Sequence, residues 1–249
     1  MATPTKVLII AGGLGFTTWA DIRLNRGNFH AYTLQSKIAL TMTAALILIP
    51  GLFFFFFELE PSTSLSEHFL ISFFQSVTTR TAGYNTIDIK DFSETGRAAL
   101  IALMLIGGSP GSTAGGIKTT TAFTLFAIMI ATFRLKKDPT CFSRRLSSET
   151  QRHAVTILMM YLLLFASGSV LLNLIDGIRL IDSAFETASA LGTVGLSIGV
   201  TDDLGPLSKY VMMLLMFFGR IGGLTVIFAA HAHSRQDSGR SPEERITIG

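Results

Sequence analysis

Long uncharged stretches alternate along this chain with short segments that carry nearly all of its charged residues. The uncharged stretches are 38–57, 98–117, 119–133, 154–175 and, apart from Arg220, 210–230. A helix of roughly 20 apolar residues crosses the hydrocarbon of a bilayer, so several of these stretches predict membrane-spanning helices. The apolar segment 69–79 is different, because its roughly 11 residues make a helix of only about 16 Å. It predicts a helix that enters a membrane without crossing it.

The pattern occurs twice. At an offset of 112 residues, these pairs coincide without a gap: Phe73 with Phe185, Thr81 with Thr193, Gly83 with Gly195, and Gly107 with Gly219. Each copy consists of a long apolar span, a half-length segment, a T-x-G tetrapeptide, an acidic stretch and a second span. The sequence therefore predicts an all-α polytopic membrane protein built from two helix, re-entrant loop, helix repeats.

Composition and charge support this interpretation. The mean hydropathy is +0.50, and only 15% of the residues are charged, so the apolar residues must face lipid. Lys and Arg gather in loops 21–37 and 134–153 and in the C-terminal tail, which the positive-inside rule places in the cytoplasm; the expected membrane is the plasma (inner) membrane. Most acids lie in 58–97 and 176–209, so the outer face should attract cations. Both flanks of each half-length segment fall on that face, which requires the chain to dip in and return.

The T-x-G tetrapeptides are the candidate ion-binding residues. They are Thr81-Ala82-Gly83-Tyr84 and Thr193-Val194-Gly195-Leu196. Glycine lets the backbone aim successive carbonyls one way, and such carbonyls can replace the hydration shell of a cation. One T-x-G is an ordinary turn, but two copies, each behind a half-length apolar segment, predict a selectivity filter for a desolvated cation; no other metal site is expected.

A second candidate site interrupts the apolar run 98–133. As one helix this run would be roughly 54 Å long, which exceeds the hydrocarbon thickness. Glycines and a proline predict a break near the bilayer middle, read as a gating loop made of Gly107, Gly108, Ser109, Pro110, Gly111, Ser112, Thr113, Ala114, Gly115 and Gly116. A kinked helix packed through glycine is the alternative. A nucleotide-binding loop is excluded, because its motif requires glycine directly before lysine, and here Ile117 separates Gly116 from Lys118.

Two arginines lie at membrane depth. Arg220 interrupts the last span, and a cation there is a functional-site hypothesis. We expect it to face the gating loop, where it repels cations in the closed state or binds the loop carbonyls; an ion pair between helices is the alternative. Arg80 lies beside the first tetrapeptide. Its guanidinium group is expected to bind an acid such as Glu186 and so to stabilise the backbone conformation of the filter. His231 and His233 are taken as interfacial anchors rather than metal ligands.

At these residues the chain resembles the Trk/Ktr/HKT superfamily of potassium transporters, closest to the C-terminal half of a Ktr/Trk-type membrane subunit. The matching strings are SVTTRTAGYN (76–85), GGSPGSTAGGIKTTT (107–121), SALGTVGLS (189–197) and GRIGGLT (219–225). The resemblance implies four units around one pore, with filter glycines at Gly83 and Gly195 and a gate at 107–116 facing Arg220. Gly223 departs from the family's usual proline, which should loosen that helix.

The implied organisation has five parts. They are the tail of a preceding unit with a cytoplasmic loop (1–35), a third pore unit (36–134), a basic linker (135–153), a fourth pore unit (154–233) and a cytoplasmic tail (234–249). The first part is read from Gly12-Gly13-Leu14-Gly15, which echoes Gly219-Arg220-Ile221-Gly222; a signal peptide is the alternative. Two filter segments make half a pore, so we expect a fragment of a longer protein or completion by another half.

The expected function is therefore potassium transport rather than enzymatic catalysis, with sodium as a conceivable coupling ion and no cofactor. A non-conducting accessory subunit is the alternative function. The expected partners are the missing or homologous half, a second membrane subunit, a cytosolic nucleotide-binding ring and the lipid bilayer, with no nucleic acid. The ring would dock on the basic loops, although acidic lipid explains their charge equally well.

Overall fold

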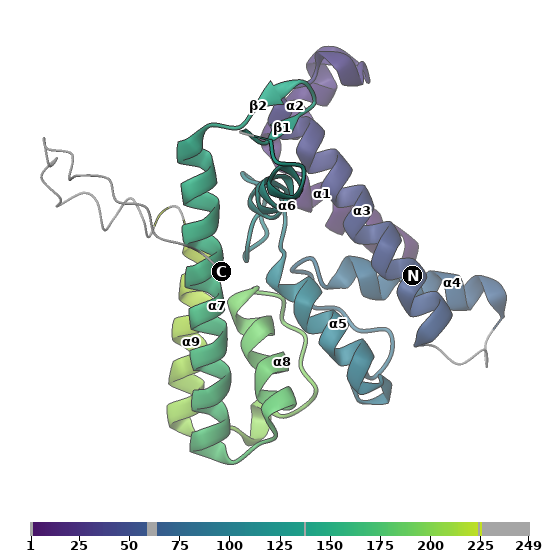
Figure 1. The fold of residues 1–249 in the computed structure, drawn as a ribbon. Coiled ribbons are helices and arrows are strands. Elements are labelled where there is room, and N and C mark those ends of the chain that lie inside the picture. Colours follow the sequence, from purple (N-terminus) through teal and green to yellow (C-terminus); the bar gives the residue numbers. More distant parts are fainter. Residues whose placement is uncertain (1, 59–63, 137, 224, 226–249) are drawn as a thin grey trace, which may run out of the picture.

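The computed structural model describes residues 2–58, 64–136, 138–223 and 225, and shows helices joined by short connections (Figure 1). His231, His233 and the tail 234–249 lie outside the described residues. The elements in chain order are α1 (Ala2–Gly13), α2 (Phe16–Asn25), η1 (Phe29–Ala31), α3 (Leu34–Phe57), α4 (Leu65–Thr78), η2 (Ile89–Asp91), α5 (Glu94–Leu105), α6 (Thr119–Phe133), β1 (Thr140–Cys141), β2 (Arg144–Arg145), α7 (Ser148–Asp176), α8 (Leu180–Leu191), η3 (Thr201–Asp203) and α9 (Pro206–Ile221).

Among the described residues, two helices are long and apolar enough to cross a membrane, α3 with 24 residues and α7 with 29. Each begins at a hydroxyl cap, because Thr33 accepts a hydrogen bond from the Ser36 amide and Ser147 accepts one from the Thr150 amide. Such caps satisfy amides that the first helical turn leaves without partners. The predictions of long helices over 38–57 and 154–175 are confirmed in length and position.

The order of elements repeats as the sequence predicts. A long helix (α3 or α7) is followed by a short one (α4 or α8), a non-helical return segment and another helix (α5 or α9). Within each copy the short helix packs on the long one, and α5 packs on α8 to join the copies. Figure 1 shows α8 between α7 and α5. The core between the copies is formed by Phe54, Leu100, Met104, Phe185 and Leu196.

The N-terminal segment bends sharply where the sequence echoes the end of the chain. Helices α1 and α2 meet at 95°, with Gly15 at φ 83° and ψ 150°. Gly222, its counterpart in the echo, has nearly the same conformation, φ 81° and ψ 146°, and follows the end of α9 at Ile221. This left-handed conformation is open to glycine and ends the helix. The span predicted over 210–230 is therefore broken at Gly222, and residues 224 and 226–230 lie outside the described part of the chain.

The basic linker carries structure that the sequence analysis did not predict. Strands β1 and β2 form an antiparallel hairpin that pairs Thr140 with Arg145 and Cys141 with Arg144. The two turn residues, Phe142 and Ser143, have φ of 45° and 62°, the left-handed pair that suits the twist of a two-residue hairpin. This small hairpin departs from the all-α expectation.

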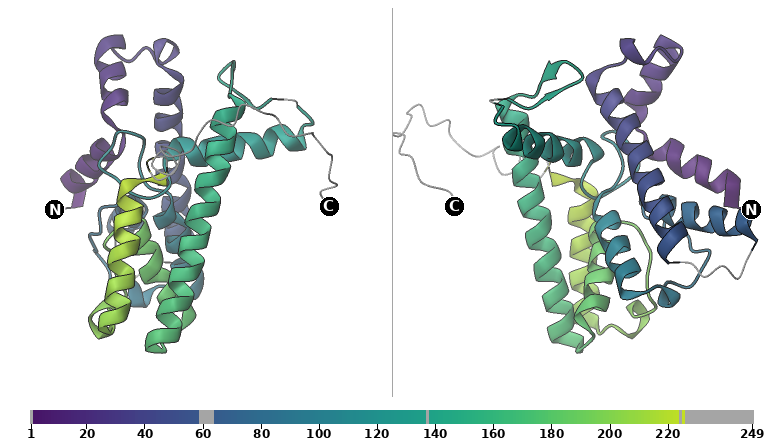
Figure 2. Two further views of the ribbon diagram at one scale, coloured as in Figure 1. Left: turned by 90° about the vertical axis from the view of Figure 1, so that its left-hand side faces the viewer. Right: turned by 45° about the vertical axis from the view of Figure 1, so that its right-hand side comes forward.

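Helix α6 takes a direction of its own. Figure 2 shows it running crosswise to α7, near the N-terminal end of α7 and close to the β1–β2 hairpin. It packs on α3, α7 and β1. The 13 residues from 106 to 118 separate it from α5, so the apolar run 98–133 is broken as predicted, and its second part turns across the bundle.

Candidate functional site

Both T-x-G tetrapeptides begin just after a short helix and share an unusual backbone. Thr81 and Gly83 have φ of 60° and 72°, and Thr193 and Gly195 have φ of 52° and 87°. A β-branched residue rarely adopts positive φ, and such strain costs of order 1–3 kcal/mol. The same two positions are left-handed in each copy. The surrounding structure therefore imposes one backbone shape on both tetrapeptides.

The two tetrapeptides touch each other, although 112 residues separate their glycines. A Cβ added to Gly83 would overlap the carbonyl oxygen of Val194 and lie 3.2 Å from the Cα of Gly195. Only glycine fits at this close approach. The backbone of one segment therefore packs directly against the backbone of the other. The carbonyl of Tyr84 accepts a hydrogen bond from Thr78 Oγ1 at 2.6 Å, which ties the end of the first segment to its helix.

Glu186 of α8 braces the return segment of the second copy. Its Oε1 accepts hydrogen bonds from Ser197 Oγ (2.7 Å) and the Ile198 amide (3.1 Å), and its Oε2 accepts one from Thr201 Oγ1 (2.7 Å). The side chain is 1% exposed. At the offset of 112 the first copy has Phe74 at this position. The brace therefore belongs to one copy alone.

The expected pairing of Arg80 with Glu186 is wrong. Both Glu186 oxygens are occupied by its own return segment, whereas Arg80 faces α3, where its Nη2 donates to Thr43 Oγ1 at 3.2 Å. Arg80 is 4% exposed, and its Nη2 lies 3.7 Å from the Cβ that Gly13 lacks. Its position next to the first tetrapeptide agrees with the expectation, but it contacts α1 and α3 instead of α8.

Substituting Glu186 tests whether this brace is structural. We expect Glu186→Gln to lower the free energy of unfolding by about 1–3 kcal/mol, because the new amide points a donor at groups that already donate. Thermal unfolding in detergent measures the change. The matched control is Asp202→Asn, a nearby carboxylate that is exposed and should shift stability by less than about 0.5 kcal/mol. Equal effects of the two substitutions would contradict the brace.

The glycine-rich loop is closed at its base by backbone hydrogen bonds. The Gly107 amide donates to the Ile117 carbonyl (2.9 Å), the Ile117 amide to Leu105 (3.0 Å), and the Thr119 amide to Gly108 (3.1 Å). Ser109 is 1% exposed, and its hydroxyl lies 3.0 Å from that of Thr119. The predicted break is thus an ordered loop, which differs from a simple kink between two helical segments.

This loop packs against the second tetrapeptide and against α9. A Cβ at Gly115 would overlap Thr193 Oγ1 and lie 2.8 Å from Thr193 Cγ2. The Gly116 amide donates to the Gly219 carbonyl at 3.3 Å. The loop is therefore in direct contact with Thr193 of the second tetrapeptide.

Two cationic side chains bind the carbonyls of the loop. Arg220 Nη1 donates to the Thr113 carbonyl, as the loop-binding hypothesis for Arg220 requires. Lys118 Nζ donates to the Ala114 carbonyl at 2.5 Å. The sequence analysis gave Lys118 no role; its signal was that it alone interrupts the apolar run 98–133. Charged donors make stronger hydrogen bonds than neutral ones, so both residues stabilise this loop conformation.

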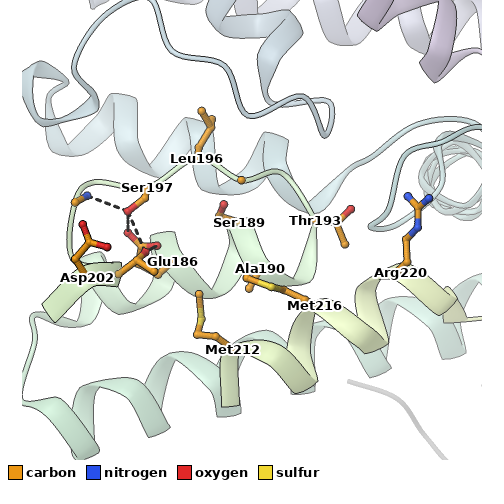
Figure 3. A pocket seen from close by; sticks show the side chains of 13 residues that line it. Glu186, Ser189, Ala190, Thr193, Leu196, Ser197, Asp202, Met212, Met216 and Arg220 are labelled. Atoms are coloured by element: carbon orange, nitrogen blue, oxygen red, sulfur yellow. Dashed lines mark hydrogen bonds between the residues drawn. The ribbon is translucent and has the colours of Figure 1, made fainter. Parts of the chain in front are cut away.

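Two cavities flank the tetrapeptides. One of about 680 Å³ extends between α8 and α9. Figure 3 shows Glu186, Ser197 and Asp202 at one end of it and Thr193 and Arg220 at the other. The second, of about 360 Å³, is bounded by Gly13, Arg80, Thr81 and Thr113. Each tetrapeptide therefore borders one cavity with partly polar walls, and the glycine-rich loop borders the second cavity as well.

The donor set suits backbone coordination. Among the residues described, no three His, Cys, Asp or Glu side chains lie together as metal ligands. Each tetrapeptide carries four backbone carbonyls, and groups of this kind suit a weakly held monovalent ion rather than a tightly chelated divalent one.

Comparison with known proteins places this geometry in a family. A family model described as TrkH, cation transport protein, matches residues 2–240. The chain belongs to this family. That confirms the superfamily resemblance and the expectation that the protein is not an enzyme, because the family is one of membrane transporters.

Relatives and a solved structure agree with this assignment. The chain is 40% identical to the potassium/sodium uptake protein NtpJ of Enterococcus hirae over 98% of its own length and 56% of the relative's. It is 34% identical to the Ktr system potassium uptake protein B of Bacillus subtilis, covering 97% of this chain and 55% of that one. The chain thus spans about half the length of these relatives.

The crystal structure of the potassium transporter TrkH from Vibrio parahaemolyticus has the same fold. It matches with a TM-score of 0.72 at 19% identity, over 90% of this chain and 50% of that one. Identity this low supports the fold alone. The helical membrane-transporter architecture predicted from the sequence is confirmed.

Proposed function

We propose that this chain forms half of a potassium pore, in which backbone carbonyls of Thr81–Tyr84 and Thr193–Leu196 coordinate the ion. The observation that carries the proposal is the contact between two tetrapeptides with the same left-handed backbone at Thr81, Gly83, Thr193 and Gly195. Holding threonine at positive φ twice costs free energy. A shared functional geometry explains why both copies keep this strained shape.

The membrane arrangement follows from the same elements. Helices α3 and α7 span the bilayer, whereas α4 and α8 enter from the outer face and the chain returns to that face through the tetrapeptides. Non-helical backbone is tolerated at this depth where it is buried in protein or lines a water-filled cavity. Loops 21–37 and 134–153 and the C-terminus are cytoplasmic in the plasma (inner) membrane.

Residues 107–116 act as the gate in this proposal. The loop lies against Thr193, and Arg220 and Lys118 bind its carbonyls at Thr113 and Ala114. Two cations beside an ion path also repel a permeating cation electrostatically. The closed state would therefore be held both by hydrogen bonds and by charge, and opening would require the loop to leave Arg220.

Two filter segments do not surround an ion, so the pore needs two more. In this proposal 36–134 and 154–233 are the third and fourth pore units, 1–35 ends a preceding unit, and 135–153 and 234–249 are cytoplasmic. A complementary half supplies the first two units. A second membrane subunit and a cytosolic nucleotide-binding ring complete the assembly, and sodium is the candidate coupling ion.

Rubidium uptake into liposomes tests this function. The purified chain alone is expected to give no uptake, whereas the chain joined to the first half of a homologous uptake protein is expected to transport rubidium. Added potassium should inhibit rubidium uptake more strongly than the same concentration of sodium. Empty liposomes and the complementary half alone are the controls.

A non-conducting accessory subunit is the competing function. It remains an alternative because the chain matches only about half the length of these relatives. Stable co-purification of the two halves without rubidium uptake would favour it and contradict the pore. Uptake by the assembled halves that does not discriminate potassium from sodium would contradict the carbonyl filter while leaving a cation path.

A further inference from the structure

A separate cavity of about 240 Å³, which shares no lining residue with the two cavities at the tetrapeptides, lies at the end of α6 that carries the basic linker. Its walls are apolar and come from two helices, with Met42 of α3 facing Phe123, Phe126 and Ile130 of α6. Arg134 and Lys136 form its rim, together with Thr140 and Cys141 of the hairpin. The cavity thus combines a hydrocarbon-lined interior with a cationic mouth.

The charges at this mouth are uncompensated. No acidic side chain lines the cavity, and within the described part of the chain Arg134 and Lys136 form no ion pair. Arg145 of the hairpin differs, because it pairs with Asp138 at 3.1 Å. Two unpaired cations beside an apolar slot suit a ligand with one negative head and a hydrocarbon tail.

The surroundings of the cavity also indicate lipid. Met129 is 44% exposed and Phe133 is 83% exposed on α6, and neither lines the cavity, so this helix is also apolar beyond the cavity itself. Helix α6 runs crosswise to α7 (Figure 2), the direction of an interfacial helix that lies along a membrane surface. Its C-terminal end leads directly into the basic segment 134–145.

We propose that this cavity binds an anionic phospholipid of the inner leaflet, with an acyl chain between α3 and α6 and the phosphate at Arg134 and Lys136. The side of the membrane rests on the proposed orientation, but binding itself does not depend on transport. A lipid held here would tie α6 to the membrane surface and fix the direction in which α6 leaves the glycine-rich loop.

Cys141 is the only cysteine in the chain, and it lines the cavity, so its alkylation reports occupancy. The full chain is placed in nanodiscs of phosphatidylcholine with or without phosphatidylglycerol, and its maleimide labelling rate is measured at one pH. Burial raises the pKa of the Cys141 thiol, so labelling at neutral pH should be slow enough to follow. We expect phosphatidylglycerol to slow labelling at least threefold.

Variants separate headgroup binding from general surface charge. Arg134→Gln with Lys136→Gln is expected to remove the phosphatidylglycerol effect. Arg23→Gln with Arg152→Gln, which removes the same charge from exposed positions elsewhere, should keep it. Ala127→Trp fills the cavity and should make labelling slow in both lipids. Native mass spectrometry of the same proteins should show retained phosphatidylglycerol in the unmodified chain and not in the first variant.

Three results would overturn the proposal: equal labelling in both lipids for the unmodified chain, a phosphatidylglycerol effect that survives Arg134→Gln with Lys136→Gln, or loss of the effect in the Arg23 and Arg152 control. The last would indicate general attraction to a charged surface. Because labelling requires no complementary half, failure of the rubidium experiment leaves this result unaffected.

Discussion

Gly83→Ser is expected to reduce the preference of the assembled pore for potassium over sodium by tenfold or more. The new Cβ would overlap the Val194 carbonyl oxygen, and a side chain at φ 72° costs about 1–2 kcal/mol by itself. Because about 1.4 kcal/mol is a factor of ten in an equilibrium constant, a displaced coordinating carbonyl that costs potassium this much more binding free energy than sodium is enough for the expected reduction. Rubidium uptake with potassium or sodium as competitor measures it.

Two further serine variants separate strain from position. Gly195→Ser introduces the same strain at φ +87°, but its Cβ would lie 3.8 Å from the nearest atom, the Gly83 Cα, so we expect a smaller loss of preference. Gly177→Ser is the matched control, because Gly177 has φ +67° with nothing within 4 Å of an added Cβ and lies at the end of α7. A loss of preference in Gly177→Ser equal to that in Gly83→Ser would show that backbone strain alone is responsible and would count against the filter.

Arg220→Gln is expected to raise rubidium uptake through the assembled pore about tenfold under conditions in which the unmodified pore is closed. The substitution removes the charge that binds the Thr113 carbonyl and that, in the proposed pore, repels a cation in the cavity that Arg220 and Thr193 both line. A hydrogen bond from a charged donor contributes about 1.5–3 kcal/mol, and losing about 1.4 kcal/mol of this shifts a closed–open equilibrium tenfold. Uptake rate at fixed ion gradients is the measurement.

Matched substitutions test whether the charge or its position matters. Arg220→Lys keeps the charge and should restore most of the closure, and Lys118→Gln should open the loop to a lesser degree, because Arg220 remains. Arg23→Gln removes a positive charge from α2, away from the loop, and should change nothing. An Arg220→Gln pore that stays closed, with the protein assembled and folded, would contradict the gate and support a purely structural arginine.

The second tetrapeptide and the glycine-rich loop form one packed unit in this structure. Gly115 of the loop leaves room for Thr193, and Gly219 of α9 accepts hydrogen bonds from the Gly116 amide at 3.3 Å and from Tyr161 at 3.4 Å. A movement of the loop therefore removes a contact from the second tetrapeptide. Opening and ion coordination should be coupled through Thr193 for this reason.

Much of the fold could be predicted because a bilayer imposes simple rules on sequence. The lengths of 38–57 and 154–175, the excess length of 98–133 and the offset of 112 predicted the long helices, the break and the two copies. Errors arose where one residue ended an element. Within the span expected over 210–230, helix α9 ends at Ile221 because Gly222 takes φ 81°, and hydropathy carries no information about the conformation of a single glycine.

Side-chain partners were predicted less well than positions. Arg80 and Glu186 are both close to a tetrapeptide in sequence, which made them a plausible pair. Glu186 instead satisfies its own return segment, through Ser197, Ile198 and Thr201. Local donors on the same chain segment occupy a buried carboxylate, and the sequence does not show which of several nearby donors lies within reach.

The sequence by itself determined which residues are apolar enough to lie in a membrane, where the chain must break, and which two tetrapeptides are equivalent, because these depend on composition and spacing. Only the tertiary structure decided that Gly83 meets Val194, that Gly115 meets Thr193 and that α6 turns across the bundle to form a cavity with α3. Those features depend on contacts between segments far apart in the chain, where close packing selects one arrangement among many that the same pattern allows.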